Sequence, residues 1–512
     1  MVTAPVLDLE ETRPAWAKDP TRRKLHKGFD LWLDTLEEAM KEEPPSLDAL
    51  ARAVFARRQE LTGLVTETLV QQRHRQALGQ KRAPCPQCGR ILPARAVVPR
   101  TVETLVGEVS LERPYFYCLE CKQGFYPLDA ALELAERRKQ WDIQEAGARL
   151  AAEVPFETAQ ELFSQLTGLS LSDHITHEVV SEVGQDLRVL EVSPTAEEIA
   201  QRVASVAQGK RQPPILVLAL DGAHVPTRPP EAKGPGKGRK RKRARRARWQ
   251  GEWKEAKGFR FYLVDKERIV QVLSWHQIQT DDQVGEALRQ VKEAGLIPED
   301  QVRLSVVGDG AKWIWNQVKE LFPTAVQVLD YYHLSERLHK VALAQFYDDP
   351  LKEREWVEAT KARLFFGYLD WVLADLEGMR PRDGEAAEEI RKLLGYLKEN
   401  QGWVKYASLR RKGYPIGSGG IESANKFISH VRLKRSGAWW YVEQANVMLA
   451  LRCAKHNGTL ERVFEHYKRR AMGGQRLPPP QESHDTPLFM IPPTGRFCGP
   501  FTWKQLVAHE TH

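Results

Sequence analysis

Long hydrophobic runs are missing from this sequence of 512 residues. Its longest uninterrupted aliphatic stretch, residues 215–220, is far shorter than the roughly 20 apolar residues that a membrane-spanning helix needs. The N-terminal residues also lack the basic stretch and the apolar core of a secretory signal. These absences argue against a membrane-embedded protein and predict a cytoplasmic location.

Cysteines are also few, with six in the whole chain. Four of them form two Cys-x-x-Cys pairs, and in a reducing cytosol this arrangement favours metal binding over disulfides. Thiolates at this spacing make a closed tetrahedral site in which zinc is structural rather than catalytic. We therefore predict a Zn²⁺ site formed by Cys85, Cys88, Cys118 and Cys121.

The spacer of 29 residues between the two pairs is longer than a compact zinc ribbon needs. Within it, apolar residues alternate with polar ones on both sides of Gly107, which is positioned for a hairpin turn. Either a longer hairpin or an extra turn fills the spacer. Both arrangements predict a zinc-ribbon-like module.

Positive charge is concentrated in one segment, although the formal net charge of the chain is +8. Residues 233–248 carry ten Lys or Arg and no acid, and prolines and glycines flank them. We predict a flexible loop, residues 229–250, that contacts backbone phosphates without reading bases. The alternative is a solvated charge run. The residues expected to bind DNA are Lys240, Arg241, Lys242, Arg243, Arg245 and Arg246.

An α/β pattern begins after residue 213. Strand signals at 215–220, 260–264 and 269–275 precede a helical stretch near 284–294, a strand at 302–307, a helix at 313–321 and a strand at 325–329. Three strands followed by alternating helices and strands predict a sheet that is antiparallel at first and parallel afterwards. RNase H-like domains have that order.

Two aspartates follow strands of this predicted sheet. Asp221 and Asp309 come after neighbouring strands, so their side chains can converge at one end of the sheet. Glu422 is a suitable third ligand because glycines before it allow tight turning. We expect its helix to pack on the sheet through Ile421, Ala424, Ile428 and Val431.

Such a set of carboxylates suits phosphodiester chemistry with two Mg²⁺ or Mn²⁺ ions about 4 Å apart. The alternative interpretation is structural, because Asp-Gly after a strand is ordinary turn chemistry.

Four strings in this region occur in a specific order. They are Leu220-Asp-Gly-Ala223, Val307-Gly-Asp-Gly-Ala-Lys-Trp313, Leu329-Asp-Tyr-Tyr-His-Leu334 and Gly417-Ser-Gly-Gly-Ile-Glu-Ser423. With these strings, residues 213–453 resemble bacterial insertion-sequence transposases of the ISKra type, which belong with the Mutator-like DDE enzymes. A helical insertion before the last string is part of the resemblance.

The resemblance implies roles for individual residues. Asp221, Asp309 and Glu422 would be the catalytic acids that hold the metal ions. Asp330 and His333 would form the Asp-x-x-His signature, which places His333 near the scissile phosphate as a positioning donor or proton carrier. A satisfied core histidine is the alternative for His333. The cysteine module would grip element-end DNA or another protomer, or would act only as a zinc staple.

A second basic cluster follows the Glu422 helix. Arg432, Lys434 and Arg435 precede Trp439 and Trp440, which would put cations and aromatics beside the active site. The tryptophans could equally be core residues. A helix-turn-helix outline at 155–184 is weaker, because its second helix carries acids and few cations to meet phosphates, so we favour a plain helical hairpin there.

We therefore predict a multidomain α/β protein. The segments are a helical N-terminal region (1–80), the zinc-ribbon-like module (81–130), a helical region (131–205), an RNase H-like core (210–342 with the basic loop), a helical insertion (343–412), core helices with Glu422 (413–470) and a Pro-rich tail (471–512).

The function expected from this reading is that of a DNA transposase. It would bind element ends and target DNA, work as a homo-oligomer on DNA, and associate with the nucleoid when bound. The alternatives are a domesticated DNA-binding protein that does not cut, and an RNase H-clan nuclease without joining activity.

Overall fold

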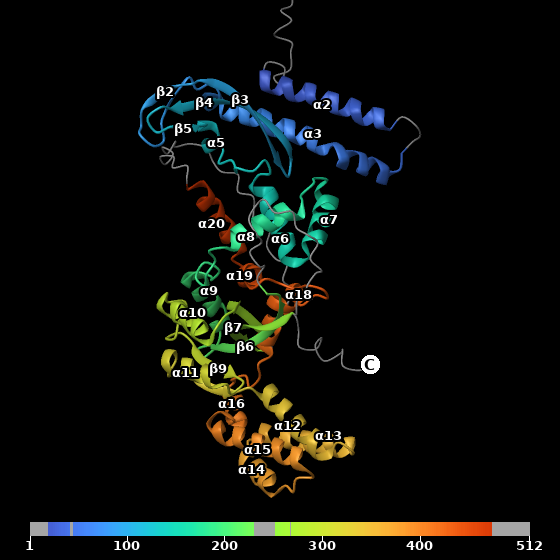
Figure 1. Ribbon diagram of the computed structural model, residues 1–512, viewed down its shortest axis with the longest axis vertical. Coiled ribbons are helices and arrows are strands. Elements are labelled where there is room, and N and C mark those ends of the chain that lie inside the picture. Colours follow the sequence, from blue (N-terminus) through green and yellow to red (C-terminus); the bar gives the residue numbers. More distant parts are fainter. Residues whose placement is uncertain (1–18, 41–44, 230–250, 267, 474–512) are drawn as a thin grey trace, which may run out of the picture. The chain divides into compact units, whose positions relative to one another are not determined.

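The computed structural model describes residues 19–40, 45–229, 251–266 and 268–473 (Figure 1). They divide into two compact units. Residues up to Glu182, together with those from Phe464 onward, form the first unit, and Val183–Val463 form the second. The predicted segments 131–205 and 413–470 therefore contribute to both units. No helix within the described ranges is both long enough and apolar enough to cross a membrane.

The first unit begins with helices, in the region that was predicted to be helical. They are α2 (Pro20–Ala39), α3 (Leu47–Arg73) and the short α4 (Arg75–Leu78). Asp19 caps α2 by accepting a hydrogen bond from the Thr21 amide at 2.8 Å, and Ser46 caps α3 in the same way. Such caps satisfy amide groups that the first turn leaves without partners. Helices α2 and α3 pack side by side (Figure 1).

Five strands follow, and the two cysteine pairs lie at their ends and in the turns between them. Strand β1 (Arg82–Pro84) pairs with β2 (Ile91–Pro93), and an antiparallel sheet joins β3 (Ala96–Thr104), β4 (Gly107–Cys118) and β5 (Gln123–Phe125). Gly107 has a φ of +128°, and a Cβ there would lie 2.3 Å from the Gln59 carbonyl oxygen, so glycine is required. A long β3–β4 hairpin fills the spacer between the cysteine pairs, which decides between the two alternatives.

The remaining helices of the first unit are α5 (Pro127–Ala131), α6 (Trp141–Glu153), α7 (Phe156–Thr167), and most of α8 (Asp173–Gly184) and α20 (Leu460–Met472). Gly168 ends α7 with a left-handed φ of +73°. On α8, Glu182 forms an ion pair with Arg137 at 2.6 Å. The acidic side chain of Glu182 thus forms an ion pair inside the unit, which agrees with the predicted helical hairpin.

A five-stranded sheet forms the centre of the second unit. Its strands are β6 (Ile215–Thr227), β7 (Glu252–Asp265), β8 (Arg268–Ile278), β9 (Arg303–Gly308) and β10 (Val326–Leu329), in the order β10-β9-β6-β7-β8. The β6–β7 and β7–β8 pairs are antiparallel, and β9 and β10 continue the sheet in parallel. This confirms the predicted change from antiparallel to parallel pairing. Residues 215–220 of β6 are all buried, so both faces of the sheet are covered.

Helices surround this sheet. Those along the strand region are α9 (Ala196–Ala207), α10 (Asp281–Glu293), α11 (Lys312–Leu321) and α12 (Tyr331–Phe346). The insertion contains α13 (Pro350–Phe365), α14 (Leu369–Gly378), α15 (Gly384–Glu399), a 3₁₀ turn (Gln401–Trp403) and α16 (Tyr406–Arg411). The last group is α17 (Gly419–Asn425), a π-helical turn (Lys426–His430), α18 (Val431–Leu433) and α19 (Val442–Asn457). Helices α17 and α19 pack on β6, β7 and β8.

Candidate functional site

Asp221 and Asp309 occupy equivalent positions on neighbouring strands. Strands β6 and β9 run parallel, and their last paired residues are Ala219 and Val307. Each aspartate lies two residues beyond its member of that pair. Both carboxylates therefore stand at the same end of the sheet, as the strand order predicted.

Strand β6 does not end at Asp221, in contrast to the sequence-based expectation. It continues to Thr227 beside β7, whereas β9 stops at Gly308. Gly222 has no left-handed φ, and a Cβ there would meet a Glu255 carboxylate oxygen at 2.0 Å. Gly222 lies inside a strand with no left-handed φ, so turn chemistry does not account for this Asp-Gly pair.

Asp309 does lie in a turn. Gly310 has a φ of +89°, and the Asp309 Oδ1 accepts a hydrogen bond from the Ala311 amide at 2.9 Å. The turn is also held from the insertion, because the Tyr396 hydroxyl on α15 donates to the Asp309 carbonyl oxygen at 2.7 Å. The second Asp-Gly pair thus has the turn geometry of the structural alternative, and its carboxylate also lies at the end of the sheet next to Asp221.

Glu422 is exposed in the first turn of α17, a helix that lies against β6 and β7. Ser418 Oγ donates to Glu422 Oε1 at 2.6 Å. Close packing against β7 requires Gly420, because a Cβ there would lie 2.5 Å from Cε1 of the buried Tyr262. The glycines before the glutamate therefore let its helix lie against the sheet.

The packing face of this helix agrees with prediction at three of four positions. Ile421, Ala424 and Ile428 are fully buried, whereas Val431 is 44% exposed. The π-helical turn at Lys426–His430 is the physical reason. A π turn holds more residues than an α turn, so it shifts the residues after it around the helix axis. Val431 leaves the buried face for that reason.

Asp330 is completely buried where strand β10 leads into α12. Its carboxylate accepts hydrogen bonds from the backbone amides of Tyr332 at 3.2 Å, His333 at 3.1 Å and Ser418 at 2.7 Å, and it also contacts His333 Nδ1. One buried carboxylate thus ties the start of α12 to the loop that precedes Glu422. Asp330 is placed to position its neighbours and does not reach the surface.

The charges of these groups influence one another. Burial, together with the negative charges of Asp309 and Glu422, raises the pKa of Asp221 to about 6, against a lowering by the Gly222 amide and His333. The hydrogen bond with Asp330 raises the pKa of His333 to about 9, so its imidazole is protonated at neutral pH. The three acids and the histidine form one electrostatically coupled group.

Three residues at this group were not identified from sequence: Ser418, Tyr396 and Asn425. Ser418 bonds both Asp330 and Glu422, Tyr396 holds the Asp309 turn, and Asn425 Nδ2 donates to Asp221 Oδ2 at 2.7 Å. Ser418 lies inside the Gly-rich string and Asn425 lies one turn after Glu422, so both could have been proposed from helical spacing. Nothing in the local sequence singles out Tyr396.

The four cysteines come together in the first unit. Cys85 and Cys88 lie between β1 and β2, Cys118 ends β4, and Cys121 precedes β5. The Sγ atoms of Cys85 and Cys121 are 3.8 Å apart, those of Cys88 and Cys118 are 3.7 Å apart, and all four ligand atoms lie within 4.8 Å of one another. The predicted cluster is therefore formed, and it could bind a metal ion such as zinc.

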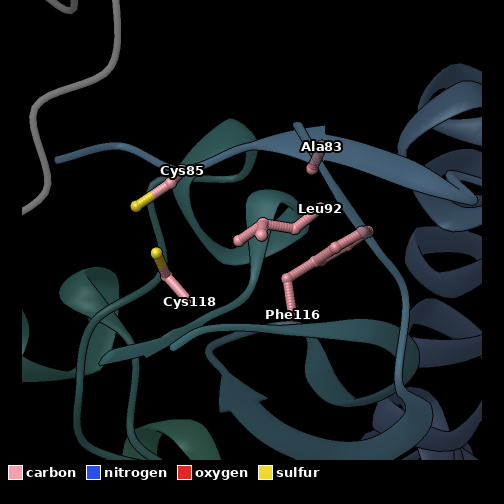
Figure 2. Packing of buried hydrophobic residues seen from close by; sticks show 5 residues of the cluster. All are labelled: Ala83, Cys85, Leu92, Phe116 and Cys118. Carbon is pink, nitrogen blue, oxygen red and sulfur yellow. The ribbon is translucent and has the colours of Figure 1, made fainter. Parts of the chain in front are cut away.

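The core around these thiols is small (Figure 2). The sulfurs of Cys85 and Cys118 point toward each other beside Ala83, Leu92 and Phe116. The backbone amide of Cys88 lowers the pKa of Cys85 to about 7, whereas hydrogen bonding with the Cys88 side chain raises the pKa of Cys121 to about 12. The thiols thus differ in how readily they ionise, and a cation that binds thiolates would favour ionisation of all four.

The predicted basic loop, including Lys240, Arg241, Lys242, Arg243, Arg245 and Arg246, lies outside the described residues. Its stem is described. Trp440 bonds the backbone on both sides of Thr227, through the Pro226 carbonyl at 3.1 Å and the Arg228 amide at 2.9 Å. The end of β6 that leads into the loop is therefore fixed next to the second basic cluster.

In that second cluster, Arg432 is 3% exposed and lies over the Trp440 ring, 4.9 Å from its centroid. A buried guanidinium does not face a DNA backbone, so the prediction that Arg432 contacts phosphate does not agree with the structure. Lys434 is partly exposed and Arg435 is exposed. Trp439 contacts Trp253, a residue that is 54% exposed, with ring centroids 6.2 Å apart.

The model of a family described as "Uncharacterised protein family (UPF0236)" matches residues 94–470, which is more than half of the chain. The match includes both aspartates of the sheet, Asp330, His333, Glu422 and the second cysteine pair. A search of curated proteins found no match.

Proposed function

Since the chain belongs to the family UPF0236, whose description names no activity, we propose from the site itself that this protein is a DDE-type DNA transposase. The observation that carries the proposal is the placement of Asp221, Asp309 and Glu422. Two lie at equivalent positions of parallel strands, the third comes from a helix packed on β6 and β7, and burial together with the charges of the other two raises the pKa of Asp221.

The fold supports this proposal. Three antiparallel strands are followed by two parallel ones, and the order β10-β9-β6-β7-β8 puts the first strand of the series in the centre. We take this as an RNase H-like core interrupted by the helical insertion. The four strings that resemble ISKra-type transposases lie within β6, at the ends of β9 and β10 and at the start of α17, so the resemblance includes the residues of the site.

The residues fit a pair of hard divalent cations by donor type. Carboxylate oxygens are the ligands that Mg²⁺ and Mn²⁺ prefer, and the clustered negative charge at Asp221 is what a cation would neutralise. Among the described residues, the group of three or more His, Cys, Asp or Glu side chains that could hold a metal ion is the four cysteines, so the proposal for the acids rests on their donor type and placement. Phosphodiester chemistry at such acids uses two ions about 4 Å apart. When bound, the ions would activate the attacking hydroxyl and neutralise the leaving oxygen.

The chain's own residues supply positioning and charge. His333 is protonated at neutral pH, so it donates hydrogen bonds and does not act as a base. Asp330 holds the Nδ1 side of the ring, which leaves the N–H at Nε2 for a phosphate oxygen. Asp330 also holds the Ser418 amide, and Ser418 in turn orients Glu422. The histidine and the glutamate are thus fixed by the same buried carboxylate.

We assign the four cysteines to a structural Zn²⁺ ion. Four protein ligands close a tetrahedral site and leave no open position for a substrate, so catalysis at this metal is not expected. Lys434, Arg435 and the basic loop between β6 and β7 are proposed to contact DNA phosphates, with homo-oligomers assembling on the element ends. The protein would act in the cytoplasm, on the nucleoid.

The experiment that tests this function separates DNA binding from cleavage. Asp309→Asn keeps the shape of the side chain but weakens metal capture, because an amide is neutral. We expect it to abolish metal-dependent cleavage of DNA from the ends of the element and to leave DNA binding within about twofold of wild type. Cleavage by Asp309→Asn at the wild-type rate would refute the assignment.

The two alternatives give different results in the same assay. A domesticated binding protein would bind end DNA and never nick it, with or without Mn²⁺. A nuclease of the RNase H clan would cut, with the same dependence on Asp309, but would yield no products joined to a target plasmid.

A further inference from the structure

Asn425 is a buried polar side chain in contact with the proposed metal site. It is 4% exposed, and its Nδ2 donates to Asp221 Oδ2 at 2.7 Å. Its Oδ1 is also buried, and no described residue donates a hydrogen bond to it. A buried carbonyl oxygen without a donor is destabilising. Such an atom requires an explanation, and its contact with Asp221 suggests one.

The backbone sets Asn425 at a particular point. It is three residues after Glu422, so both side chains leave the same face of α17. It is also the last residue before the π-helical turn Lys426–His430. Single π turns inside helices are rare and occur frequently at functional sites. The helix thus directs Glu422 and Asn425 toward the same end of the sheet and changes its geometry immediately afterwards.

We propose that Asn425 is a fourth member of the metal site, as a positioning residue for Asp221. Its amide fixes one carboxylate oxygen of Asp221, which leaves Oδ1 as the oxygen presented to a cation. The free Asn425 Oδ1 accepts a hydrogen bond from a water molecule of the cation's hydration shell. Mg²⁺ and Mn²⁺ sites of this type retain several waters, so a donor is supplied when the site is loaded.

This inference rests on the proposed function, because it requires a divalent cation at Asp221. A purely structural role for Asn425 predicts something different: its removal would cost stability and would leave the metal affinity unchanged. Residues that orient metal ligands typically change metal affinity by roughly 10-fold to 100-fold when they are replaced. Metal affinity therefore distinguishes the two roles.

The test is a Mn²⁺ titration of the full-length, zinc-loaded protein, with free Mn²⁺ followed by electron paramagnetic resonance. The variants are Asn425→Ala and Asn425→Leu, which both remove the donor, and Leu retains side-chain volume if Ala leaves a destabilising cavity. Asp221→Asn identifies the site that is being titrated. Asn446→Ala is the matched control, since Asn446 bonds the backbone of Ile278 on β8 and does not bond the acids.

We expect both Asn425 variants to bind Mn²⁺ about 10-fold to 100-fold more weakly than wild type, and Asn446→Ala to bind it as wild type does. Wild-type affinity in the folded Asn425 variants, together with loss of binding in Asp221→Asn, would overturn this inference and leave the proposed function standing. A wild-type protein without Asp221-dependent Mn²⁺ binding would overturn both.

Discussion

A buried histidine of the five-stranded sheet gives a quantitative prediction about stability. His276 on β8 is fully buried, and neither ring nitrogen has a hydrogen-bond partner among the described residues. Burial and the nearby Arg260 lower the pKa of His276 to about 3. The pKa of His456, on α19, is lowered well below its ordinary value by burial and by the charges of Arg260 and Arg452. Arg260 also donates to the Gly420 carbonyl of α17.

The sign of the pH dependence follows from these shifts. Both histidines bind a proton in the unfolded chain below pH about 6.5, and neither does so in the folded protein until the pH is much lower. The free energy of unfolding therefore carries no penalty from these two histidines above pH about 6.5, and it decreases as the pH falls below that value. At pH 5 the loss from His276 is about 2 kcal/mol relative to pH 8, and the lowered pKa of His456 adds a loss of the same sign.

The perturbation is His276→Leu, which keeps a similar volume and removes the two unpartnered nitrogens. We expect equal or greater stability at pH 8, because an apolar side chain has no hydrogen bonds to lose. The loss between pH 8 and pH 5 should decrease by about 2 kcal/mol. Hydrogen exchange at the β8 amides measures the stability of the second unit by itself, which matters in a chain of two units.

The control for that experiment is His339→Gln, at an exposed position on α12, which should keep the full wild-type pH dependence. If His276→Leu lost as much stability between pH 8 and pH 5 as the wild-type protein does, the buried, neutral histidine would not be the source, and the reasoning would fail.

Further substitutions test the packing, the loop and the zinc module. Gly420→Ala should place a methyl group against Tyr262 and shift Glu422, which lowers the cleavage rate on the order of 100-fold without loss of DNA binding. The control Gly395→Ala, at a position with open space, should cleave normally. A normal cleavage rate in Gly420→Ala would contradict this prediction. Alanine at the arginines of 241–246 should weaken DNA binding equally for all sequences and reduce the salt slope by about 0.9 per lost phosphate contact; an unchanged slope would indicate a solvated charge run. Cys85→Ser should release zinc and expose the β1 and β2 amides to hydrogen exchange. The reason is that zinc binding, worth roughly 10–16 kcal/mol, stabilises a module with a small core. Hydrogen-exchange protection equal to that of the wild type would show that the module folds without metal.

The sheet was predictable because its signals are local. Apolar runs mark β6 and β9, and the alternation of strands and helices after β8 determines which pairs are parallel. From that order alone, Asp221 and Asp309 were expected at one end of the sheet, and the register confirms it. The cysteine cluster was predictable for the same reason, since metal-ligand spacing is visible in the chain.

What sequence reasoning missed depends on contacts between distant segments. Arg432 is a typical phosphate ligand by residue type, but it packs on Trp440 and is buried. Val431 follows a π turn that an ideal α-helical period does not anticipate. Tyr396 lies in the insertion, 87 residues after Asp309, and no local sequence pattern predicts a contact between them.

The most direct test of the transposase assignment is a combined cleavage and joining assay. Purified protein is incubated with labelled DNA from the element end and a plasmid target in Mg²⁺ or Mn²⁺, beside Asp221→Ala and Glu422→Ala. We predict nicked and joined products that require the metal and disappear in both variants. Cleavage that survives both substitutions would show that the active site lies elsewhere in the protein.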